Sequence, residues 1–181
     1  MSPDERSSRA KLGVNAETLK PKPVSASATT LAQLMEPADA NPMGNVHGGV
    51  IMKLVDQAAA AASIRHSGRI CVTVAVDRID FFAPVHVGDL LVLKAAVNYT
   101  HRTSMEAGVR IEAQTLHTGE VRHAGSALVI FVALDDQCRP TPVPPILPET
   151  EDEKIRFKQA ELRYRHRKEL REKERALRSH S

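Results

Sequence analysis

The stretch Asn41-Pro-Met-Gly-Asn-Val-His-Gly-Gly-Val-Ile-Met-Lys-Leu-Val-Asp56 decides the fold of this chain. Its Pro and Gly residues predict a turn that opens directly into a helix, which we expect to run from about Gly48 to His66. Small side chains fill 58–63 and permit close approach by whatever wraps the helix. Gly68 supplies the stop. Because most sides of this helix are apolar, we expect it to be buried.

One carboxylate, Asp56, stands among the apolar residues of this helix. It follows Gly48 by eight residues, which places it roughly 12 Å along the axis from the helix start. The N–H groups of Gly48 and Gly49 lack intrahelical partners and could stabilise an oxygen that gains negative charge, while Asp56 could serve as a base. The residues alone leave a second interpretation open. In it, Asp56 is a buried acid bonded to a neighbouring backbone or Ser/Thr group, and the glycines only form a turn.

The composition fits one domain with a core of moderate size. The 181 residues are 42% hydrophobic and 26% charged, and no apolar run reaches 18 residues. Since the N-terminus also lacks the pattern of a secretory signal, we expect a cytoplasmic protein with no membrane partner. The net charge of +3 is too small to indicate nucleic acid. Cys71 and Cys138 lack metal-ligand spacing, so we expect neither a metal nor a cofactor.

Composition also divides the chain into four segments. Residues 1–26 have the composition of a disordered segment, 27–136 form the domain, and 137–149 contain five prolines and read as a linker. Residues 150–181 begin with a capping box and continue with mixed charges, which predicts a charged surface helix. A basic tail that binds a partner is the alternative, although acids nearly balance bases there.

The domain is expected to contain a short strand at 29–35 before the helix and four strands after it, at 70–82, 89–102, 104–117 and 123–134. The short loops between these four strands predict an antiparallel meander. In 70–76 and 124–134 both faces are largely apolar or small. One face can cover the helix, and the other requires a second layer, which is another subunit, a local loop or the C-terminal tail.

Six motifs occur in a specific order along the chain: Asn45-Val-His-Gly-Gly49, Ile51-Met-Lys-Leu-Val-Asp56, Val72-Thr-Val-Ala-Val-Asp77, Phe81-x-x-Pro84-Val-x-x-Gly88-Asp89, Arg102-Thr-Ser-Met105 and a tail segment at 143–154. In this order the sequence resembles the hotdog-fold acyl-CoA thioesterases of the bacterial YciA type and the brain-type cytosolic acyl-CoA hydrolases, over roughly 29–167. The resemblance implies an α+β hotdog fold. An antiparallel sheet of five to six strands would wrap one long central helix, with a charged C-terminal helix added.

The resemblance also implies hydrolysis of an acyl-CoA thioester, with CoA as part of the substrate and product and not as a cofactor. Asp56 would activate water or attack the thioester directly, Asn45 would orient the water or the carbonyl, and the N–H groups of Gly48 and Gly49 would polarise that carbonyl. His47 is assigned to the substrate site and is expected to orient the turn. The remaining predicted substrate contacts are Val72, Thr73 and Val74, for pantetheine or the early acyl chain, and Arg102, Thr103 and Ser104, for CoA. The alternative for Arg102 is an ordinary solvated strand end.

One departure from the family concerns Asn45 and Asp56. Two-domain members divide these residues between repeats, whereas this chain carries both in one repeat. We therefore expect a homodimer in which each site takes Asn45 from one chain and Asp56 from the other, and the family implies a trimer of dimers. Two other functions stay open. One is a hydratase or dehydratase that pairs His47 with Asp56, and the other is a non-hydrolytic acyl-CoA sensor or scaffold.

Overall fold

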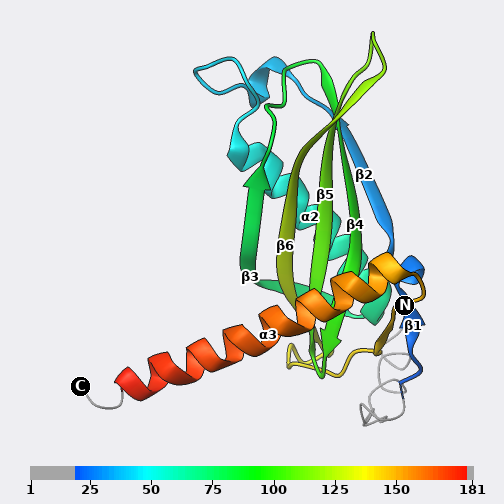
Figure 1. Cartoon of the computed structure of the whole chain (residues 1–181), viewed down its shortest axis with the longest axis vertical. Helices are drawn as coiled ribbons and strands as arrows, with labels where there is room; N and C mark the ends of the chain where they lie inside the picture. Colours follow the sequence, from blue (N-terminus) through cyan, green and yellow to red (C-terminus); the bar gives the residue numbers. More distant parts are fainter. Residues whose placement is uncertain (1–18, 179–181) are drawn as a thin grey trace, which may run out of the picture.

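The computed structural model describes residues 19–178, so the disorder predicted for 1–18 lies outside the described residues. Two long helices, α2 (Gly48–Ser67) and α3 (Glu151–Arg178), lie on opposite faces of a five-stranded antiparallel sheet (Figure 1). The strands are β2 (Thr29–Leu34), β3 (Ile70–Phe81), β4 (Asp89–His101), β5 (Ser104–Thr115) and β6 (Glu120–Leu134). This is the α+β hotdog architecture that the sequence motifs imply.

Helix α2 is the buried centre of the domain. Its buried residues are Ile51, Leu54, Val55, Ala58, Ala59, Ala62, Ser63 and His66. The small residues allow the inward side chains of β4 and β5 to pack closely on the helix. Gly68 ends the helix in the left-handed region, at φ 66°, and its N–H donates to Ile64 O at 2.8 Å. The predicted helix and its stop are therefore confirmed.

The strand order is β2-β4-β5-β6-β3, which corrects the predicted four-strand meander. Only β4, β5 and β6 follow one another as a meander, while β3 pairs with β6 at the far edge. Because the sheet wraps α2, the segment 82–88 can carry the chain from β3 back to β4 across the strand ends. Phe82 N–H and Ala83 N–H both donate to Ala124 O on this path, at 2.8 and 3.3 Å. The short loop at 82–88 therefore joins two strands, β3 and β4, that are not neighbours in the sheet.

Helix α3 forms a second layer on the outer face of the sheet. Glu106 of β5 is 1% exposed and accepts from Arg163 at 2.6 Å, and Tyr99 of β4 packs against Phe157 with ring centroids 5.2 Å apart. The second layer on the outer face of the sheet is thus formed by the C-terminal segment, one of the three possibilities considered from the sequence. The valines of β3 at 72, 74 and 76 stay 40–50% exposed.

Parts of the segment predicted to be disordered (1–26) and of the predicted Pro-rich linker (137–149) form ordered structure on the domain. A two-residue strand β1 (Lys22–Pro23) pairs in parallel with β7 (Ile146–Leu147), and a 3-10 turn, η2 (Val24–Ser27), follows β1. Val24 and Val143 are buried, so the predicted disorder is wrong for 22–26, and the Pro-rich linker at 137–149 packs against the domain. The prolines favour extended backbone, while the few apolar residues between them pack on the core. A second 3-10 turn, η3 (Pro37–Asp39), follows β2.

Candidate active site

A tight loop at 41–47 delivers the chain to the start of α2. The Asn41 side chain holds this loop, because its Oδ1 accepts from Met43 N–H at 2.9 Å and from Asn45 N–H at 3.2 Å. Gly44 adopts φ 82°, where glycine carries no steric penalty. Val46 N–H donates to Val85 O at 2.8 Å and ties the loop to the segment after β3. The helix start is therefore tied to the loop and, through Val85, to the segment after β3.

His47 caps α2, and its ring orients the turn as expected. Its Nδ1 accepts from Gly49 N–H at 2.9 Å, so in the neutral ring the proton sits on Nε2. The Gly49 N–H group is therefore engaged within the protein. Within residues 19–178, no group accepts from the N–H of Gly48. Of the two N–H groups predicted to polarise the substrate carbonyl, only that of Gly48 is left available for this contact.

A groove of about 380 Å³ opens beside this free donor. Asn45 and Gly48 line it together with Ile51 and the ring of Phe81. A methyl group at Gly48 would lie 3.8 Å from that ring, so the glycine leaves the backbone accessible next to an apolar wall. Such a groove suits an apolar group that carries a carbonyl at one end.

Asp56 is half-buried and meets β3 at the open edge of the sheet. Its Oδ1 accepts a hydrogen bond from Thr73 Oγ1 at 2.6 Å. Thr73 was predicted as a substrate contact, and the structure makes it the partner of the acid. In the described part of the chain, no protein group donates to the second carboxylate oxygen. The acid is thus held by a Thr, as one interpretation foresaw, and it also keeps an oxygen for a water molecule or substrate.

Asp56 and Gly48 do not meet within one chain. Eight residues of continuous helix separate them, which is about 12 Å. A hydrolytic water bound to Asp56 and a carbonyl bound to Gly48 of the same chain would therefore be too far apart to react.

The two predicted CoA segments lie in register at one end of the sheet. Val132 of β6 pairs with Val72 on one side and with Ser104 on the other. Arg102 forms the β4–β5 turn with φ 26°, and its carbonyl accepts from Val143 N–H at 2.9 Å. Thr103 O accepts from Ala133 N–H at 3.0 Å. The turn is thus braced by backbone contacts, and among residues 19–178 no hydrogen bond or ion pair engages the exposed Arg102 side chain.

Among 19–178, no group of three or more His, Cys, Asp or Glu side chains is placed to hold a metal ion. Neither helix of that part of the chain has the length and apolar character needed to span a membrane.

Residues 43–120 match the family model of the thioesterase superfamily. The chain is 37% identical over 147 residues to the cytosolic acyl coenzyme A thioester hydrolase of Rattus norvegicus, covering 80% of this chain and 39% of that protein. It therefore spans about two fifths of the length of that relative. It is 35% identical over 141 residues to the uncharacterized acyl-CoA thioester hydrolase YkhA of Bacillus subtilis, covering 78% of this chain and 82% of that one.

Solved structures agree with these relatives. An apo-hexameric acyl-CoA thioesterase superposes with a TM-score of 0.81 at 36% identity, covering 84% of this chain and 97% of that one. An acyl-CoA hydrolase from Staphylococcus aureus, in complex with butyryl-CoA and CoA, superposes with a TM-score of 0.79 at 32% identity, covering 86% and 94%. Variants of that enzyme replace an Asp, a Thr 17 positions after it, or an Asn 15 positions before it by Ala. The fold, the helix-borne acid and these matches together show that this chain belongs to the acyl-CoA thioester hydrolases of the thioesterase superfamily.

Proposed function

We propose that this protein hydrolyses the thioester of an acyl-CoA to a free carboxylic acid and CoA. The observation that carries the proposal is Asp56, held on the central helix by Thr73 at 2.6 Å with its second oxygen left unpaired by the described protein groups. The relatives that bear the name acyl-CoA hydrolase support the substrate class.

The site residues can perform this reaction in one displacement. Asp56 takes a proton from water, and the water oxygen attacks the carbonyl carbon. The resulting oxyanion is stabilised by a Gly48 N–H at the positive end of α2. Collapse of the tetrahedral intermediate breaks the C–S bond, and the CoA sulfur leaves with a proton returned from Asp56. Direct attack by the carboxylate would instead form an anhydride that water then cleaves.

A second copy of the chain would bring these groups together. Asp56 and Gly48 of one chain are about 12 Å apart along the helix, while the edge of β3 beside Asp56 carries exposed valines. Pairing of two copies would allow Gly48 and Asn45 of one to face Asp56 of the other. The similar apo-thioesterase is described as a hexamer, which supports an oligomeric form of this protein.

The spacing in the Staphylococcus aureus variants brings a second Asn into the proposal. Asp56 and Thr73 show the same separation of 17 positions. The Asn that lies 15 positions before Asp56 is Asn41, whereas Asn45 lies 11 before it. Asn41 holds the helix-start loop through two hydrogen bonds, while Asn45 lines the groove. We therefore assign Asn41 to positioning the helix start and keep Asn45 as the candidate that faces the carbonyl.

The direct test measures release of the CoA thiol from a panel of acyl-CoAs. Wild type should turn over, Asp56→Ala should lose nearly all activity, and Asn41→Ala and Asn45→Ala will show which amide matters. A wild-type rate in a folded Asp56→Ala variant would refute the assignment. Turnover of enoyl-CoA without thiol release would favour a hydratase, and tight binding of acyl-CoA without any turnover would favour a sensor.

The shared site has its own test by complementation. Chains with Asp56→Ala are co-expressed and purified with chains that carry Ala at whichever of Asn41 and Asn45 the thiol-release test shows to be essential, so that each chain is inactive alone. If each site draws on two chains, random pairing restores about a quarter of the wild-type activity, because half of the dimers are mixed and each mixed dimer has one intact site. No recovery in a sample that contains mixed dimers would refute the cross-chain site.

A further inference from the structure

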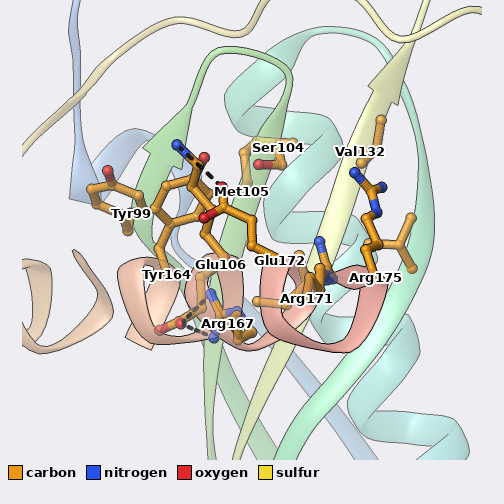
Figure 2. Close-up of a pocket in the computed structure, with 13 residues that line it drawn as sticks. Tyr99, Ser104, Met105, Glu106, Val132, Tyr164, Arg167, Arg171, Glu172 and Arg175 are labelled. Carbon is orange, nitrogen blue, oxygen red and sulfur yellow. Dashed lines mark hydrogen bonds and ion pairs between the residues drawn. The ribbon is translucent and has the colours of Figure 1, made fainter. Parts of the chain in front are cut away.

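The second half of α3 covers a cleft that is separate from the groove at Gly48, and two of the predicted substrate contacts, Val74 and Ser104, line it. The helix crosses the outer face of the sheet and projects past the β3 edge (Figure 1). Beneath it lies a cavity of about 290 Å³, whose floor is formed by Val74 of β3 and by Ile130 and Val132 of β6. Ser104 of β5 lies at one side of the cavity, opposite the arginines of α3 (Figure 2).

Four cations of α3 line this cleft, Arg167, Lys168, Arg171 and Arg175, together with the carboxylates of Glu106 and Glu172. Arg167 is satisfied by the protein, since it contacts Asp77 at 2.8 Å and Glu106 at 3.4 Å. Lys168 reaches Glu172 only at 4.0 Å. Among residues 19–178, no acidic group lies within 4.0 Å of the guanidinium of Arg171 or Arg175, and both line the cavity. Two unpaired guanidiniums therefore face the same space.

Like charges lie close together on this part of α3, and Glu172, three residues before Arg175, offsets part of their repulsion. Arg171 and Arg175 are four residues apart on one helix, and like charges at that spacing destabilise a helix. The pKa of His101 is lowered first by burial and then by the positive charges of Arg102 and Lys168, the second of which lines the cleft. An anion in the cleft would relieve this repulsion.

We propose that this cleft binds the phosphate groups of a nucleotide, with Arg171 and Arg175 as the principal contacts. Guanidinium groups match phosphate oxygens in bidentate fashion, and the Ser104 hydroxyl adds a donor from the sheet side. The valines of the floor suit an uncharged part of the same ligand, which inorganic phosphate lacks. Two sources carry this chemistry. One is the nucleotide half of CoA, which rests on the proposed function, and the other is a free nucleotide such as ATP.

Calorimetric titration of the full-length protein with CoA and with ATP tests the proposal. The double variant Arg171→Gln/Arg175→Gln should bind the cognate probe at least tenfold more weakly than wild type. The control Lys173→Gln/Arg178→Gln removes the same charge from exposed positions of the same helix outside the cleft, and its affinity should stay within about twofold. Affinity in wild type should also fall as salt rises, because the contacts are ionic.

The kinetic arm separates the two sources. If the ligand is the CoA nucleotide, the double variant raises KM for acyl-CoA about tenfold and leaves hydrolysis of acyl-pantetheine, which lacks the nucleotide, unchanged. If the ligand is a free nucleotide, only ATP binding weakens. Equal affinity of wild type and the double variant for both probes would overturn the proposal. The calorimetric titration measures binding and does not require hydrolysis. A failure of the catalytic proposal would therefore appear in the thiol-release assay and leave the binding test unaffected.

Discussion

The hydrogen bond from Thr73 to Asp56 should control the rate of hydrolysis without controlling stability. Thr73→Val removes the hydroxyl and keeps the side-chain shape. A hydrogen bond to a charged group is worth about 1.5–3 kcal/mol when shielded, but Thr73 is exposed, so we expect about 1–2 kcal/mol. If that energy is lost from the transition state, kcat falls about 5- to 30-fold. The free energy of unfolding should change by less than about 0.5 kcal/mol, because water can replace the hydroxyl at this exposed carboxylate in the resting protein but does not hold the carboxylate in its reactive position.

The assay is thiol release at saturating acyl-CoA, combined with urea unfolding of each variant. Thr73→Ser keeps the hydroxyl and should retain most of kcat, which distinguishes positioning of the acid from simple packing. In the Asp56→Ala background, Thr73→Val should cause no further loss, since its only argued role is to hold the carboxylate. A wild-type kcat for Thr73→Val, or an equal loss in Thr73→Ser, would refute this reasoning.

Three further perturbations follow from the structure. Gly49→Ala would place a methyl group 3.1 Å from the ring of the capping His, whereas Gly48→Ala meets only ordinary contact at 3.8 Å. We therefore expect Gly49→Ala to lower the melting temperature and Gly48→Ala to lower kcat with normal melting. Glu106→Gln breaks a buried ion pair with α3 and should lower the free energy of unfolding by about 3–5 kcal/mol in urea titrations, with a smaller loss if the amide keeps a hydrogen bond. Burial disfavours the charge on Asp89, but backbone and side-chain hydrogen bonds and the charge of Arg122 outweigh it and lower the pKa. The contribution of Asp89 to the free energy of unfolding is fully present above the unfolded carboxyl pKa of about 3.9 and is lost as the pH falls through the lower folded pKa. Asp89→Asn should therefore make the free energy of unfolding depend less on pH in the acid range.

The central helix and its acid could be predicted because several local signals agree there. A Pro/Gly turn, a long apolar run without proline, and Gly68 as a stop all specify one buried helix, and the sequence alone is enough to locate them. The position of β3 could not be predicted in the same way. Strand pairing depends on how the sheet curls around α2, and a loop at 82–88 is short enough for either neighbour. Family resemblance supplied the architecture where the local pattern was ambiguous.

The roles of neighbouring polar residues were harder to predict than their positions. Gly48 and Gly49 are chemically identical in the sequence, and only the side chain of His47 decides which N–H group stays free. Thr73 was expected to touch substrate, but the register of β3 against α2 directs its hydroxyl to Asp56. The tail arginines of the α3 cleft had no motif to mark them, because their acidic neighbours in the sequence suggested ordinary helix pairs. In each case the role of the residue depends on a contact with another element or on the orientation of one side chain, and neither can be read from a local sequence pattern.

The place of Asp56 explains how a buried helix tolerates an ionisable group. The strands wrap α2 on the sides that carry its buried residues, and Asp56 instead faces the open β3 edge, where Thr73 and solvent solvate the carboxylate. A second copy covering that edge would remove part of this water. Its loss would strengthen the bond from Thr73, because hydrogen bonds gain strength in a less polar surrounding. Assembly would therefore order the acid at the same time as it brings a Gly48 donor from the other chain. On this reasoning an isolated chain should hold Asp56 correctly and still hydrolyse poorly.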